Sequence, residues 1–181
     1  MRSESAWRES LRPADVSTVV GMGSIVSAPA DLVIATSDGI DVHFAGIDLD
    51  ASLSAQAQEP PGGNGVRISL AAVRGEETMR RDGQFQAARL AWAQRRQDQV
   101  TEEEPVPLMP GFSVLDRVGV VLSDELGTEY RLVAGQAAGD GTEWESAWEF
   151  VPQPSEVSGT LRLQFTLDGA PTGKTCEVRV P

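Results

Sequence analysis

Hydrophobic and polar residues alternate most clearly in the second half of the chain. In residues 161–168 every second residue is leucine or phenylalanine, and the residues between them are polar. Residues 144–150 alternate in the same way, with Trp144 and Trp148 on one side and glutamates on the other. Such a period of two predicts strands with one buried face. Shorter apolar runs predict further strands at residues 32–36, 40–47, 66–73, 118–122, 130–132 and 176–180.

Turn-forming residues separate these predicted strands. Gly, Pro, Asn, Asp and Ser gather at residues 37–39, 60–65, 123–127, 139–141, 152–159 and 168–173. Turns spaced about 8 to 15 residues apart are typical of an antiparallel sandwich or barrel. We therefore predict a mainly β fold, an antiparallel sandwich of about seven to nine strands.

One segment breaks the β pattern. Residues 84–100 are rich in helix formers, contain no Gly or Pro, and place Phe85 and Trp92 on one helical stripe. An acidic and proline-containing linker follows. We therefore expect one domain over 1–181, built from halves 16–73 and 105–181 and separated by an Arg-rich helical insert with its linker at 76–104. Residues 1–15 are read as either a short packed helix or a tail.

The length and net charge of the chain limit the kinds of protein that it can be. The chain has 181 residues, 40% of them hydrophobic, and a net charge of -12. A chain of this length can bury a substantial core without disulfides or metals. Its negative field repels phosphate backbones and anionic lipids, so we expect no nucleic acid and no membrane as partner.

Targeting features point to a cytoplasmic protein. The uncharged run at residues 16–30 superficially resembles a secretory leader, but acids at positions 4, 9 and 15 replace the basic start that a leader needs. No run reaches the ~20 apolar residues of a membrane span. The single cysteine allows no internal disulfide and fits a reducing compartment, without excluding secretion.

The chain is short of side chains for catalysis. It has one histidine, His43, one cysteine, Cys176, one lysine, Lys174, and one tyrosine, Tyr130. These residue types are the usual bases, nucleophiles and metal ligands. We therefore expect no catalytic residue, no cofactor and no bound metal. His43 is expected at the surface and Cys176 in the core.

Three motifs resemble ligand-binding or catalytic sites and fail in detail. Gly169 to Thr175 ends like a phosphate-binding loop, but it has three residues between its glycines instead of four and precedes a strand, so Lys174 is expected in a solvated turn. Asp48 and Asp50 have a calcium-loop spacing without the other ligands. Glu145 and Glu149 are expected as a solvent-facing row, too far apart for paired carboxylate catalysis.

The insert supplies the candidate partner-binding residues. Six arginines and only three acids occur between residues 74 and 96. Such a basic patch suits an acidic or phosphorylated partner, and a solvated helix face crossed by salt bridges is the alternative. The residues proposed to contact a partner are Arg81, Arg89, Trp92 and Arg96.

Aromatic residues of the second half supply a candidate ligand-stacking set. Tyr130, Trp144 and Trp148 lie in the strand region. Tryptophans of this kind are usually core residues, but an exposed one beside Tyr130 would make a stacking platform for a sugar or a peptide.

The second half resembles a known class of domain. It contains Leu-Ser-Asp-Glu-Leu-Gly-Thr-Glu-Tyr at 122–130, a Gly-rich loop at 135–141, the tryptophan strand, and Phe-Val-Pro-Gln-Pro at 150–154. Together these are similar to immunoglobulin-like β-sandwich domains of uncharacterised bacterial proteins. The resemblance implies an immunoglobulin-like sandwich and transfers no functional residue.

The sequence thus favours a non-enzymatic interaction or accessory module. Its partner is expected to be another protein, and neither its identity nor the oligomeric state follows from the residues. A carbohydrate-binding or small-ligand-binding sandwich is the alternative, and a carboxylate-based hydrolase is a third reading.

Overall fold

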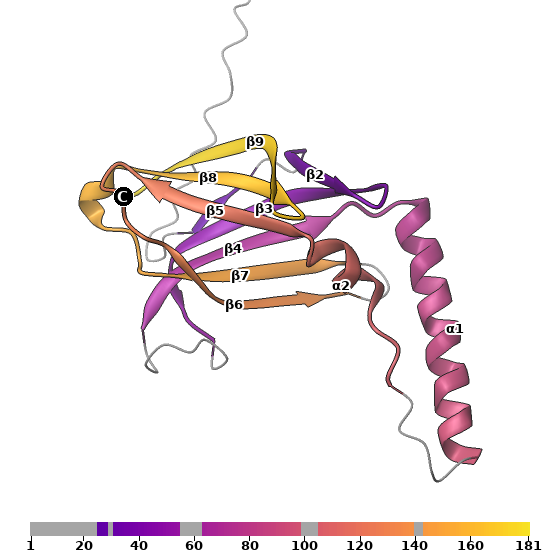
Figure 1. The fold of residues 1–181 in the computed structure, drawn as a ribbon. Coiled ribbons are helices and arrows are strands. Elements are labelled where there is room, and N and C mark those ends of the chain that lie inside the picture. Colours follow the sequence, from indigo (N-terminus) through magenta and orange to yellow (C-terminus); the bar gives the residue numbers. More distant parts are fainter. Residues whose placement is uncertain (1–24, 29–30, 55–62, 99–104, 140–142) are drawn as a thin grey trace, which may run out of the picture.

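The structure, a computed structural model, describes residues 25–28, 31–54, 63–98, 105–139 and 143–181 (Figure 1). The predicted N-terminal helix or tail at 1–15 therefore lies outside the described residues. Nine described strands form two antiparallel sheets. Their bounds are β1 Ile25–Ser27, β2 Val33–Ser37, β3 Ile40–Ser52, β4 Asn64–Ala72, β5 Val118–Asp124, β6 Arg131–Ala138, β7 Glu145–Val151, β8 Thr160–Leu167 and β9 Ala170–Arg179.

The larger sheet combines strands from both halves of the chain. Its strand order is β1-β3-β4-β7-β6, and β2 also pairs with β3. Strand β4 pairs with one side of β3. Strands β1 and β2 therefore both pair with its other side, one after the other, and together form one edge of the sheet. The pairing of β4 with β7 joins the two halves across the insert. The smaller sheet has the order β5-β8-β9.

The core lies between the two sheets. Leu161, Leu163 and Phe165 of β8 are fully buried, as their alternation predicts. The ring of Phe165 meets that of Phe44 in β3, with 5.6 Å between ring centroids. The mainly β, two-sheet antiparallel fold is thus confirmed. The immunoglobulin-like assignment stays a prediction, since strand content alone does not establish it.

The inserted helix is longer than predicted. Helix α1 spans Glu76–Asp98 and begins eight residues before the predicted start at 84. At its first turn the Thr78 hydroxyl accepts from the Gly75 backbone N–H and donates to the Gly75 carbonyl. Acids in the first turn and arginines in the last turn also suit the helix dipole. Gly83 faces open space, so no close contact requires a glycine at this position of the helix.

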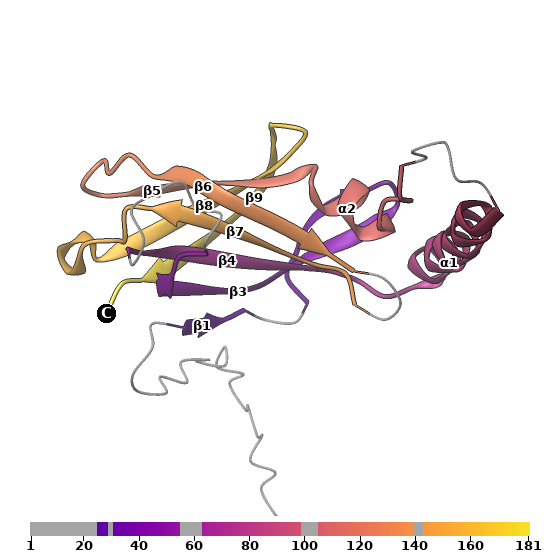
Figure 2. The same ribbon diagram turned by 90° about the horizontal axis from the view of Figure 1, so that it is seen from below.

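Helix α1 points away from the sandwich. In Figures 1 and 2 its first turns lie at one end of the sheets and its last turns extend well beyond them. A short helix, α2 at Pro110–Leu115, leads the chain back, with Val114 and Leu115 fully buried. A single 3-10 turn, η1 at Glu156–Ser158, precedes β8. Among the described helices, none is long and apolar enough to cross a membrane.

Two hairpins share the same turn. Asp38-Gly39 joins β2 to β3 and Asp168-Gly169 joins β8 to β9, with φ of 51° at each Asp and 78° at each Gly. Positive φ at both positions is what a two-residue type I′ turn requires. Because this second turn ends at Gly169, the predicted turn at 168–173 is too long. Lys174 lies inside β9 and not in a turn.

Candidate interaction surface

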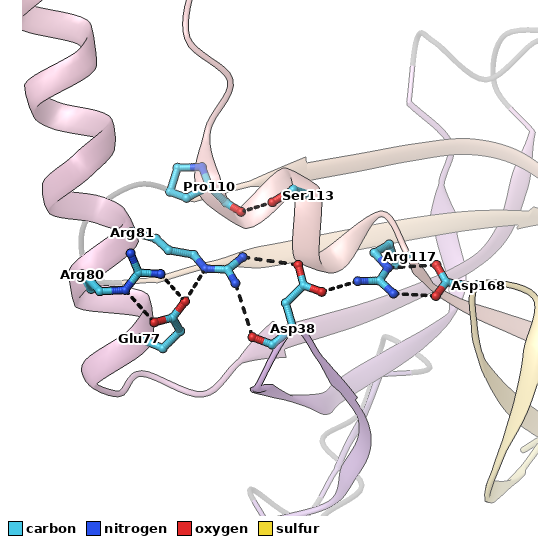
Figure 3. A network of polar contacts seen from close by, with 8 residues as sticks. All are labelled: Asp38, Glu77, Arg80, Arg81, Pro110, Ser113, Arg117 and Asp168. Carbon is cyan, nitrogen blue, oxygen red and sulfur yellow. Dashed lines mark hydrogen bonds and ion pairs between the residues drawn. The ribbon is translucent and has the colours of Figure 1, made fainter.

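Arg117 joins the two hairpin turns. It lies just before β5 and donates from Nε and Nη2 to both oxygens of Asp168, at 2.9 and 2.6 Å, while Nη1 donates to Asp38 (Figure 3). The Asp168 carboxylate, followed by Asp38, raises the pKa of Arg117 above its ordinary value, and the guanidinium lowers the pKa of Asp168. A residue from each sheet is therefore held by one guanidinium.

The same chain of charges continues into the base of α1. Arg81 donates to Glu77 at 2.8 Å and to the Asp38 carbonyl at 3.3 Å, and Arg80 donates twice to Glu77. Hydrogen bonds from Arg80 and Arg81 lower the pKa of Glu77 to about 2. Figure 3 shows positive and negative side chains in alternation from Arg80 to Arg117. Arg81, which is also predicted to contact a partner, fastens α1 to the sandwich, and its side chain is 20% exposed.

A buried hydrogen bond gives the second attachment of α1. The indole Nε1 of Trp144 donates to Asp82 Oδ1 at 3.0 Å, and both residues are buried. The other oxygen, Asp82 Oδ2, is buried without a hydrogen-bond partner. Phe85, one turn further along the helix, is also buried. Trp144 is therefore a core residue that holds α1, and it does not meet the condition of an exposed ring beside Tyr130 on which the stacking platform depends.

The distal part of α1 is exposed to solvent. Leu90 is 66% exposed, and Trp92 is half-buried. The guanidinium of Arg96 lies over the Trp92 ring at 5.2 Å, and that of Arg89 lies over Phe85 at 5.6 Å. Three of the four residues predicted to bind a partner thus lie on this distal part, in a ladder of alternating aromatic and guanidinium groups.

Exposed apolar side chains concentrate on the insert and the chain that returns from it. Of the twelve large hydrophobic residues that are exposed in the described chain, six lie between residues 79 and 112. Leu108 is 79% exposed, the most of any. We call this set the arm surface; it consists of Met79, Leu90, Val106, Leu108, Met109 and Phe112. These residues are concentrated in one part of the chain, and apolar patches on a surface mark interaction sites where their side chains are contiguous.

Asp124 organises the β5–β6 turn, and Tyr130 belongs to that cluster. The Asp124 carboxylate accepts from the hydroxyls of Thr128, Tyr130 and Ser158 and from two backbone N–H groups. Led by the Thr128 hydroxyl, these donors hold the pKa of Asp124 well below its usual range, against a smaller effect of burial. Burial and the Asp124 carboxylate raise the pKa of Tyr130 to about 12. The phenol therefore stabilises a turn, since its only oxygen is engaged there.

Glu149 is buried, not part of a solvent-facing row. Its Oε1 accepts from Nε and Nη2 of Arg67, at 3.2 and 2.9 Å, and its Oε2 accepts from the Ser54 backbone N–H at 2.8 Å. Burial alone would raise the pKa of Glu149, but the Ser54 and Arg67 donors outweigh it and lower the pKa. The register of β4 and β7 places Arg67 directly opposite Glu149. Glu145, in contrast, is exposed as predicted.

A small hollow opens above Glu149 on the outer face of the larger sheet. It has a cavity volume of about 150 Å³ and is lined by Ser54, Ala134, Gly135, Gln136, Ala147 and Glu149. On the opposite face of the same strands, the Trp148 ring lies against Gly135, where a Cβ would come within 2.2 Å of it. Trp148 is half-buried against the core. Tyr130, Trp144 and Trp148 therefore do not form one exposed platform.

A wider groove lies between the edges of the two sheets. Its volume is about 400 Å³, and its walls come from β2 and from the β8–β9 hairpin. The lining is mostly apolar, with Lys174 as its only charged residue. The hydroxyls of its two threonines already donate hydrogen bonds within the fold, Thr36 to Asp41 and Thr172 to the Phe165 carbonyl.

The remaining candidates are isolated from one another. His43 is half-buried in β3, and Cys176 is half-buried rather than fully buried, with its pKa raised by burial and by Glu177. Asp50 accepts hydrogen bonds from Asn64 and Gln153. Within the described ranges, no group of three or more His, Cys, Asp or Glu residues is arranged to hold a metal ion.

Comparison with known proteins adds no relative. No protein-family model matches the chain, and no curated protein or solved structure is significantly similar to it.

Proposed function

We propose that this protein is a non-enzymatic interaction module that presents α1 to a partner protein. The observation that supports this most directly is a helix whose base is fixed at two places while its distal part and the returning chain expose apolar side chains. The single cysteine fits a reducing compartment, and we propose a cytoplasmic location.

A fixed base makes the exposed helix useful for recognition. The charge chain from Arg80 to Asp168 and the Trp144–Asp82 hydrogen bond set the direction in which α1 leaves the sandwich. A helix held in one direction loses less conformational entropy when a partner binds. Leu90 on the helix and Leu108 on the returning chain then supply apolar contact area, and the terminal arginines add charge.

The titrating groups give no support to the hydrolase reading. A carboxylate-based enzyme needs one acid with a raised pKa beside an ionised one. The described carboxylates with shifted pKa values are Glu77, Asp124, Glu149 and Asp168, and each is shifted downwards. Each of them also already accepts hydrogen bonds within the fold.

The proposal is tested by comparing two surface variants. One carries Leu90→Asp with Arg96→Glu on α1; the control carries Val121→Asp with Arg179→Glu on the smaller sheet, where both residues are exposed. Each protein, checked for folding by circular dichroism, is used for affinity capture and mass spectrometry from an extract of its source cells. We expect the α1 variant to lose a partner that the wild type and the control both retain. If all three capture the same proteins, α1 is not the binding element.

A further inference from the structure

The open edges of the two sheets are built differently. Edge strand β9 contains Pro171, Lys174 and a register shift. Edge strand β2 is only five residues long and also has a register shift. Proline, lysine, bulges and short length are the usual means of preventing another chain from pairing with an edge. These two edges are therefore protected.

Among the other open edges, β5 contains neither proline nor lysine. Strand β6 also lacks both and is longer than β2, although its pairing with β7 shifts register between Leu132 and Ala134. It is eight residues long, it is the outermost strand of the larger sheet in Figure 1, and among the described strands it pairs with β7 alone. From Leu132 to Ala138 it has no charged residue and no proline. Every residue of β6 is at least partly exposed. In the regular part of the strand, residues 134–138, the second row of backbone N–H and C=O groups faces away from β7 and can pair with an added strand.

A specificity pocket adjoins this edge. Ala134, Gly135 and Gln136 of β6 form one wall of the 150 Å³ hollow whose floor carries Glu149. Ala134, which pairs with Glu149 on the outer face, has a small side chain and leaves the way from the edge to the hollow open. In strand addition, backbone hydrogen bonds supply affinity and neighbouring pockets for alternate side chains supply specificity. The edge and the hollow together have the parts of such a site.

Charge indicates what the hollow accepts. A carboxylate has about four lone-pair positions, and the Glu149 carboxylate uses three of them for Arg67 and Ser54. Glu145, exposed on the same face, lies directly opposite Ala138 of β6. The whole chain has a net charge of -12, which attracts basic ligands. Arg67 already balances the charge of Glu149, so the charges that favour a cation are the exposed Glu145 and the net charge of the chain, while the fourth lone-pair position of Glu149 can accept one more hydrogen bond.

We propose that an extended, basic segment of a partner protein adds as a further strand to the free edge of β6, with a lysine or arginine side chain reaching over Ala134 toward Glu149. This site lies apart from α1 and does not depend on the interaction proposed for that helix.

The test uses a blocked ten-residue peptide of alternating valine and lysine, with hydrogen exchange of the backbone amides followed by NMR. We expect added peptide to slow exchange at alternate residues of Arg131–Ala138 by about tenfold or more, because an amide that gains a strand partner exchanges only on opening. The edge of β9, Ala170–Arg179, serves as internal control and should not change. Protection at β9 or β5 instead of β6 would overturn the assignment.

Two modified peptides separate strand addition from attraction of charge. One is N-methylated at all valines and the other at all lysines, so their charges are equal but each lacks a different row of amide donors. Strand addition predicts affinities that differ about tenfold or more, since only one row faces β6. Equal affinities would show that charge alone binds the peptide. A peptide with glutamate in place of lysine should not bind.

The hollow is tested by filling it. Ala147→Leu places a larger side chain in the hollow, and Ala45→Leu, an exposed position on the same face of β3, is the matched control. The first variant should bind the lysine peptide at least about tenfold more weakly, and the control should bind it like the wild type.

Protection of β6 that rises with protein concentration in the absence of peptide would make a second copy of the chain the occupant and overturn the proposal. The α1 variant Leu90→Asp with Arg96→Glu should bind the peptide normally, so the two proposals fail separately.

Discussion

The Trp144–Asp82 hydrogen bond is the most accessible test of how α1 is held. Removing one residue of the pair leaves the polar group of the other buried without a partner among the described residues. Asp82→Ala removes the acceptor of the indole N–H, and Trp144→Phe removes the donor to the carboxylate. Hydrogen bonds to charged groups contribute about 1.5 to 3 kcal/mol, and an unsatisfied buried group costs a similar amount. Each single variant should therefore lose roughly 2 kcal/mol or more, equivalent to about 4 to 8 °C in Tm for a domain of this size.

A double-mutant cycle isolates the pair from the lost ring volume. The double variant Asp82→Ala with Trp144→Phe leaves neither group unpaired, so its loss of stability should be less than the sum of the single losses by about 1.5 to 3 kcal/mol. Urea unfolding followed by far-ultraviolet circular dichroism measures this without relying on tryptophan fluorescence, which Trp144→Phe would itself alter. A coupling energy below about 0.5 kcal/mol would refute the view that this bond fastens the helix.

Three further predictions concern the charged clusters. Arg117→Gln should lower Tm more than Arg162→Gln, since Arg117 joins two hairpins whereas Arg162 makes one exposed pair; equal shifts in thermal unfolding would contradict this. Tyr130 should ionise near pH 12 in an absorbance titration, and nearer its ordinary value in Asp124→Asn; its raised pKa contributes stability below pH 10 that is lost as the pH rises to about 12. Glu149→Gln should lower the free energy of unfolding by about 1 to 3 kcal/mol at pH 7, measured by urea unfolding. This difference should shrink at acid pH, where the wild-type glutamate is protonated, and a difference that stayed constant would argue against an ionised Glu149.

The local sequence pattern predicts the structure correctly where one period of hydrophobic residues dominates. The alternation in residues 161–168 predicts both β8 and its buried face, because a strand between two layers has only one way to hide its apolar side chains. The Ser-Asp-Gly segment at 37–39 predicts the first hairpin, since positive φ is available to Gly and tolerated by Asp.

The local sequence pattern does not predict contacts between residues that are far apart in the chain. Glu149 alternates with apolar residues and so reads as solvent-facing; it is buried because Arg67, 82 positions earlier, lies opposite it. Asp82 likewise reads as an ordinary acid of a charged helix. It is a buried hydrogen-bond acceptor because the indole of Trp144, just before β7, donates to it. The early start of α1 was missed because Gly83 weakens the helical pattern, whereas the Gly75–Thr78 cap supplies the start.

The pairing of β4 with β7 has a consequence for the order in which the chain becomes structured during synthesis. Strand β4 leaves the ribosome before α1, the linker, α2, β5 and β6, yet its neighbour β7 ends only at Val151. Until then Val66, Ile68 and Leu70, all fully buried in the finished molecule, have β3 on one side but no strand on the other, and the cover of β8 follows later still. Exposed apolar surface and an unpaired strand edge are the features that make incomplete chains aggregate and that chaperones recognise. The helical insert thus lengthens the interval in which the first half of the nascent chain depends on outside protection.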